Sequence, residues 1–99
     1  MWLASEWVVG AELQWAKHRP DDLLDVICLL LSRNLSEWEL ELLGSGPIET
    51  LLSLNYDDMV NRVMEIARQN KDAQTALLFV DPPPDKESHF DQLLIGVRM

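Results

Sequence analysis

Residues 36–54 read SEWELELLGSGPIETLLSL, and this stretch decides the fold. It opens with SEWE at 36–39, the spacing of a capping box, in which the serine hydroxyl and the Glu39 carboxylate each bind an otherwise unpaired amide at a helix start. It continues with GSGP at 44–47, where a glycine typical of helix ends precedes a proline typical of helix starts. The stretch therefore predicts a helix that ends at Leu43, a tight turn, and a new helix from Ile48.

Helical patterning extends outward from this stretch in both directions. Leu, Met and Ala supply 28 residues against 13 from Val, Ile and Thr, and no long segment alternates apolar and polar positions. The sequence therefore predicts an all-α fold of about six or seven short helices. Such helices form either a compact bundle or an αα-superhelical array, and the sequence leaves both open. The expected helices cover 4–18, 20–32, 36–43, 48–54, 55–70, 72–79 and 86–97.

Individual helices carry specific expectations. The 20–32 helix has apolar residues on nearly all sides, so we expect it to be the central and most enclosed element. In the helix before it, Trp7 and Trp15 share one stripe and are expected to lie in the core. Asn55 and Asp72 are expected to cap the two helices that begin near them.

A chain of 99 residues is expected to form one domain. Its last helix is expected to be set apart from the helical body by a proline-rich spacer. Residues 1–80 form the expected helical body. The run DPPPD at 81–85 cannot be helical, so it is expected to form an extended, proline-rich spacer. Beyond it, apolar residues recur at three- and four-residue intervals. Residues 86–99 are therefore expected to form an amphipathic helix that packs on the body or on a partner.

The composition narrows the classes of partner. Eight basic residues against seventeen acidic ones give a formal charge of −9, which argues against direct binding to nucleic acid or to an anionic membrane. A charged partner is therefore expected to be basic. The one cysteine, Cys28, has no internal partner for a disulfide, and the first residues lack the pattern of a signal peptide or a membrane span. We accordingly expect a cytoplasmic protein.

Residues that support catalysis are scarce. The two histidines, His18 and His89, lie far apart in sequence and match no metal-binding spacing. Acids at helix starts are already explained by capping and by the helix dipole, and no glycine-rich loop is followed by the lysine of a phosphate-binding motif. The sequence therefore predicts neither enzymatic activity nor a cofactor nor a metal site.

The negative charge is concentrated in one region of the chain. From Pro20 to Asp58 there are nine acids and one base, Arg33, so this stretch carries −8 of the total charge. Within it, Trp38 is flanked by acids, which suits an exposed aromatic anchor. The residues expected to contact a partner are Asp21, Asp22, Asp25, Glu37, Trp38, Glu39 and Glu41.

The segment GPIETLL at 46–52 resembles an uncharacterised family of small bacterial helical domains. In that family a Gly-Pro-Leu-Glu-x-Leu-Leu turn follows an acidic helical stretch and precedes a helix ending in Ala-Arg, as Ala67-Arg68 does here. Ile48 replaces the usual leucine, and the resemblance runs from about Trp7 to Phe79, leaving out the proline-rich tail. It implies a bacterial or phage origin and an all-α fold. It brings no functional residues, because the family has no established activity.

These features favour a small acidic binding protein without enzymatic activity. We expect its acids to converge on one face that masks the basic surface of a bacterial nuclease or nucleic-acid-guided complex, because opposite charge speeds and selects association. An immunity or antitoxin protein, or a phage-encoded anti-defence protein such as an anti-CRISPR inhibitor, has this character. The alternative is a structural or adaptor subunit that forms a homodimer through its C-terminal helix.

Overall fold

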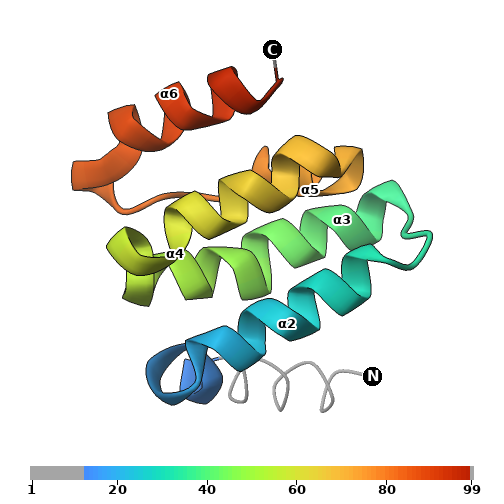
Figure 1. The fold of residues 1–99 in the computed structure, drawn as a ribbon, viewed down its shortest axis with the longest axis horizontal. Helices are drawn as coiled ribbons and strands as arrows, with labels where there is room; N and C mark the ends of the chain where they lie inside the picture. Colours follow the sequence, from blue (N-terminus) through green and yellow to red (C-terminus); the bar gives the residue numbers. More distant parts are fainter. Residues whose placement is uncertain (1–12, 99) are drawn as a thin grey trace.

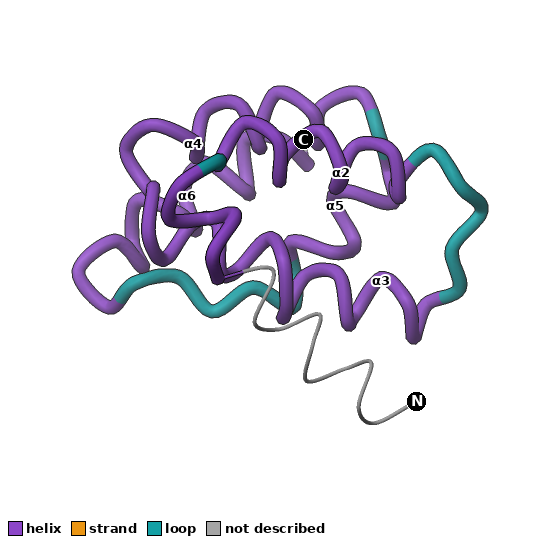
Figure 2. The backbone as a smooth tube through the Cα atoms, turned by 90° about the horizontal axis from the view of Figure 1, so that it is seen from below, coloured by secondary structure: helices purple, strands orange, loops and turns teal. Residues whose placement is uncertain are grey.

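The computed structural model describes residues 13–98, and every regular element in that range is a helix (Figures 1 and 2). The all-α prediction is confirmed. Residues 13–18 are helical, whereas Trp7 and the rest of the expected first helix lie outside the described residues. The elements that follow are α2 (Pro20–Leu31), α3 (Glu37–Leu43), the π-helical segment η1 (Gly44–Ile48), α4 (Glu49–Gln69), α5 (Lys71–Leu77), the 3-10 turn η2 (Pro84–Lys86) and α6 (Glu87–Arg98).

The central helix is α4. It packs against α2, α5 and α6, and Figure 1 shows α2 and α6 on opposite sides of it. The expectation that the 20–32 helix is central is wrong, because α2 buries one face and leaves Leu29 60% exposed on another. The core side chains that α4 supplies are Leu51, Leu52, Tyr56, Met59, Val60, Val63, Met64 and Ala67.

The helices form a compact bundle. The radius of gyration of the Cα atoms is 12.7 Å, close to the value of about 13 Å for a globular domain of 100 residues. Figure 2 shows the longer loops at the connection from α2 to α3 and at the approach to α6. Within residues 13–98, no helix combines the length and the apolar character needed to cross a bilayer.

Local capping determines where several helices begin. The Ser36 hydroxyl accepts a hydrogen bond from the Glu39 amide at 3.2 Å, and the Glu39 carboxylate accepts one from the Ser36 amide at 2.9 Å, so the capping box is confirmed. Pro20 lies in the first turn of α2, as expected. The cap of α5 is Asn70, whose side chain accepts the Ala73 amide at 3.1 Å. The prediction that Asp72 caps this helix is wrong, because the helix has already begun at Lys71.

The chain does not end its helix at Gly44. Residues 44–48 continue from α3 into α4 as a π-helix, and no glycine described in residues 13–98 has a positive φ. Pro47 explains the widening, because proline lacks an N–H and its ring clashes with the carbonyl four residues earlier. The Glu49 amide instead reaches the Gly44 carbonyl, five residues back, which is the π pattern. The expected stop and restart are therefore wrong.

Asn55 lies at a bend in α4, and its side chain links the helical residues 13–18 to α4. Asn55 has φ −138° and ψ 39°, so two helical stretches join at the boundary that the sequence predicts. Its amide nitrogen donates to the carbonyls of Ala16 at 2.7 Å and Leu51 at 3.3 Å. A cap accepts, whereas Asn55 donates, so it links residues 13–18 to α4 instead. Ala16 is buried there, and Trp15 is 37% exposed, so the prediction of a core position for Trp15 is wrong.

The C-terminal helix folds back onto the body. α6 packs on α4 and α5 through Phe90, Leu94 and Val97, and the Tyr56 hydroxyl lies 2.8 Å from His89 Nδ1. Residues 81–83 are not helical, as expected, but the expected spacer is too long by two residues. Pro84 and Asp85 begin the 3-10 turn η2. Proline is tolerated at a helix start, because the N–H groups of the first turn have no acceptor within the helix.

Candidate functional site

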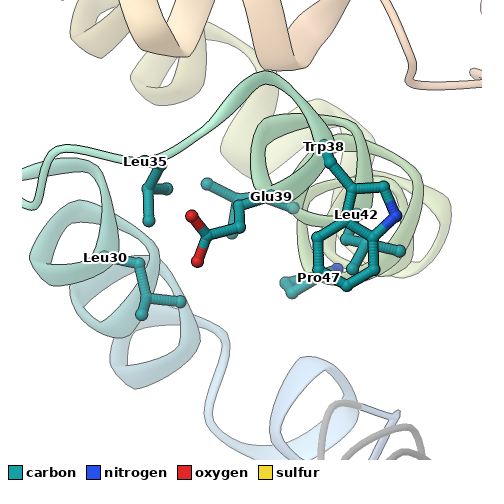
Figure 3. Close-up of a pocket in the computed structure, with 7 residues that line it drawn as sticks. Leu30, Leu35, Trp38, Glu39, Leu42 and Pro47 are labelled. Carbon is teal, nitrogen blue, oxygen red and sulfur yellow. The ribbon is translucent and has the colours of Figure 1, made fainter.

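An apolar pocket of about 300 Å³ lies beside the outer face of α3 (Figure 3). In the view of Figure 3, Leu30 and Leu35 lie on one side and Trp38 and Leu42 on the other, with the Glu39 carboxylate between them. The pocket is therefore an apolar recess that contains one carboxylate. Its walls come from α2, the loop at 32–36, α3 and η1, and they are Leu30, Leu35, Trp38, Glu39, Leu42, Leu43 and Pro47.

Trp38 and Leu42 form an exposed apolar ridge along α3. They are 64% and 50% exposed, and their four-residue spacing places them next to each other on one face of the helix. Glu37 and Glu41 have the same spacing on the adjacent face, while Glu39 lies on the other side of the ridge. Acids therefore flank the apolar ridge on both sides.

The capping box holds Glu39 in place and keeps it charged. The Ser36 backbone amide, followed by the Ser36 hydroxyl, stabilises the carboxylate form, so the pKa of Glu39 is lowered from its ordinary value of 4.5. The bond from the Ser36 amide is made by Oε1 at 2.9 Å. The pocket thus contains a carboxylate that is held in position by Ser36.

Replacing Glu39 with glutamine is expected to preserve the helix start and remove part of the pH dependence of folding. Glutamine supports the same capping geometry but does not titrate. Because the folded-state pKa of Glu39 is lowered, the ionised side chain stabilises the fold above pH 4.5, and this contribution is lost as pH falls through the folded-state pKa. Urea unfolding of both proteins from pH 7 to pH 3 measures this, and a difference that grows on acidification contradicts it.

Four basic side chains of the described region form ion pairs, and all four pair with acids outside α3. The ion pairs are Arg19–Asp22 at 2.5 Å, Arg62–Asp21, Arg68–Glu65 at 3.1 Å and Lys86–Asp57 at 3.6 Å. Among residues 13–98, no cation pairs with Glu37, Glu39 or Glu41. The α3 surface therefore presents three carboxylates without a countercharge from these residues.

The structure brings together only part of the predicted contact set. Trp38, Glu37, Glu39 and Glu41 share α3. Asp21 and Asp22 lie in the first turn of α2, and arginines pair with both. The start of α2 is the end of that helix away from the loop into α3 (Figure 1). Exposed Asp25 follows one turn later. The length of α2, about 15 Å from its first turn to its last at 1.5 Å per residue, thus separates the two acidic groups.

Sequence reasoning missed the apolar half of this site. Leu30 and Leu35 belong to α2 and the following loop, and their approach to Leu42 depends on how α2 and α3 pack. One local signal was present: Leu42 follows Trp38 by four residues on a helix whose core positions, Leu40 and Leu43, already account for burial. An apolar pair on the remaining face is typical of a contact surface.

The other reactive side chains serve the fold. Tyr56 and His89 join α4 to α6, and burial, with a smaller effect from Asp57, raises the pKa of Tyr56. Burial first and Asp25 second raise the pKa of the Cys28 thiol, and Arg62 opposes them. Within residues 13–98, no three His, Cys, Asp or Glu side chains are grouped to hold a metal ion.

The relation of this chain to known proteins rests on its sequence. No curated protein and no solved structure matches it. The sequence profile of one family, described as a family of unknown function (DUF6869), matches residues 3–81. The matched range contains the GPIETLL segment and ends before η2 and α6, in agreement with the resemblance seen in the sequence. The chain therefore belongs to the family of unknown function DUF6869.

Proposed function

We propose that this protein is a non-enzymatic binding protein that contacts its partner through α3. The observation that carries the proposal is an indole, Trp38, that is 64% exposed beside an apolar pocket and among three carboxylates. Buried aromatic anchors supply most of the affinity of protein interfaces, whereas charges at the rim speed encounter and select partners. The partner that suits this surface is a protein with basic side chains around an apolar contact.

The proposed partner handles nucleic acid. Proteins that bind DNA or RNA carry lysine and arginine surfaces that neutralise phosphates, and carboxylates compete for the same cations. The net charge of −9 adds a long-range attraction to such a surface. Covering it would inhibit a bacterial nuclease or a nucleic-acid-guided complex, in the manner of an immunity, antitoxin or anti-defence protein.

The two acidic groups have different roles in this proposal. Asp21 and Asp22 already pair with arginines of the same chain, so they add to the overall field and make no direct contact. The alternative of a homodimer through α6 has less surface to offer. The apolar face of α6 is already buried against the body through Phe90, Leu94 and Val97. Among the large apolar side chains of α6, Ile95 is the one that is exposed, at 60%.

Affinity capture from a bacterial lysate tests the proposal. The wild type is compared with Trp38→Ala and with the double variant Glu37→Gln/Glu41→Gln. A basic protein is expected on the wild type at low salt and not at high salt, because screening weakens the attraction. Trp38→Ala is expected to lower its affinity by about 30-fold, which corresponds to an anchor worth about 2 kcal/mol.

The matched control is Glu87→Gln/Asp91→Asn, which removes the same charge from exposed positions on α6 and is expected to retain the partner. The captured protein is then purified and its binding to nucleic acid is measured with increasing amounts of wild-type protein. Stoichiometric loss of nucleic-acid binding is expected. A partner that binds the α3 variants as tightly as the wild type, or that keeps its nucleic acid when saturated, refutes the proposal.

A further inference from the structure

We infer that the pocket beside Trp38 receives one arginine side chain of the partner, whose guanidinium pairs with Glu39 while its stem lies against the apolar walls. This inference rests on the proposed function and specifies the chemistry of its contact. It follows from one combination of features: apolar walls, a single fixed carboxylate and an exposed indole in the same recess.

The walls suit the hydrocarbon part of arginine. Leu30, Leu35 and Leu42 line the recess, and arginine presents three methylene groups before its charged end. Long basic side chains commonly bury such stems along apolar surface while the charged end stays at a polar position. In this pocket the polar position is the carboxylate in Figure 3.

Glu39 is prepared for this pairing before the partner arrives. Its Oε1 is held by the Ser36 amide at 2.9 Å, and none of the ion pairs among residues 13–98 involves this carboxylate. A side chain that is already ordered loses little conformational freedom on binding, which favours affinity. An aliphatic side chain in the same place would cover the carboxylate without pairing with it, and burying an unpaired charge is costly. The pocket therefore selects a cation over leucine.

The indole favours arginine over lysine. A guanidinium is planar, is weakly hydrated and stacks on aromatic faces, whereas an ammonium group is a compact, strongly hydrated charge. Trp38 adjoins Glu39 on α3 and lines the same recess. Glu37 and Glu41, across the ridge, add negative potential without entering the pocket. Together these features favour a side chain with a planar cation at its tip.

A titration followed by NMR tests the inference with small probes. The probes are the N-acetyl amides of arginine, lysine, citrulline and norleucine, and the signals are the Trp38 indole N–H and the methyl groups of Leu30 and Leu42. Trp38→Phe assigns the indole signal by its absence. Arginine amide is expected to shift these signals saturably. Citrulline, which has the same shape without the charge, is expected to bind about threefold to fivefold more weakly, as for an exposed ion pair.

Two variants separate the pocket from general attraction to an acidic protein. Glu39→Gln retains the capping geometry and is expected to bind arginine and citrulline amides equally. Glu87→Gln changes an exposed glutamate in the first turn of α6 and is expected to leave the preference for arginine intact. The inference is overturned if arginine and norleucine amides bind equally to the wild type, if arginine amide gives no saturable shift, or if Glu87→Gln weakens binding as much as Glu39→Gln.

The outcomes also separate this inference from the proposed function. A captured partner that needs Trp38, together with a pocket that ignores arginine amide, overturns the inference alone. A pocket that selects arginine amide, in a protein that captures no basic partner, overturns the proposed function alone.

Discussion

Replacing Gly44 with alanine is expected to lower the free energy of unfolding by about 3 kcal/mol, at the upper end of the cost of overpacking. A Cβ atom at this position would lie 1.9 Å from the Ala76 carbonyl oxygen and 2.9 Å from its carbon. Both are backbone atoms at the end of α5, so no side-chain rotation relieves the clash. The π-helical segment and α5 would have to move apart, which would open the core between them.

Gly96 provides the matched control. A Cβ atom at Gly96 would meet nothing within 4 Å, and the residue lies on the exposed side of α6. Gly96→Ala is therefore expected to stabilise the protein by about 0.5–1 kcal/mol through helix propensity. Urea unfolding followed by circular dichroism measures both variants. If the free energy of unfolding of Gly44→Ala is within about 1 kcal/mol of the wild-type value, the close packing of η1 on α5 is wrong.

Replacing Leu51 with alanine is expected to cost about 3 kcal/mol, within the range of about 2–5 kcal/mol for truncating a buried leucine. Leu51 belongs to the GPIETLL segment and is 0% exposed in the core. Leu52, the next residue of the segment, is 0% exposed as well. The loss combines the transfer of the removed atoms to water with the cavity that they leave.

Leu54 is the control for this second substitution. It lies three residues further along α4 and is 44% exposed, so Leu54→Ala is expected to change stability by about 0.5 kcal/mol or less. Thermal and urea unfolding of the two variants under the same conditions give the comparison. Equal losses from the two truncations would contradict the burial pattern of α4.

The features that the sequence predicts correctly are those set by near neighbours along the chain. The capping box joins Ser36 and Glu39, three residues apart, and Pro20 opens α2 through its own backbone geometry. The helix boundary at Asn55 also lies where the sequence predicts it, because asparagine disfavours helix interiors, but the cap expected there is not formed. The capping box and Pro20 need no knowledge of packing, because both act within one turn of helix.

The failures involve contacts between distant residues. Gly44 follows a leucine run and so has the pattern of a helix end. In the structure its lack of a side chain lets the backbone of η1 approach the backbone of Ala76, 32 positions along the chain. In the same way, the acids of α2 and α3 are close in sequence terms, and only the path of α2 shows that they form two groups. The pocket depends on Leu30 and Leu35 meeting α3, which no local pattern encodes.

The wide turn at residues 44–48 also sets the direction in which the exposed face of α3 points. Each residue rotates an α-helix by about 100°, so the additional residue in the π turn fixes the azimuth of α3 relative to α4. Deleting Ser45 would let the turn close to ordinary α geometry and would swivel Trp38 by about a quarter of a revolution relative to the Leu51 face. A change of chain length within residues 44–48 is therefore expected to rotate the exposed face of α3 relative to the core.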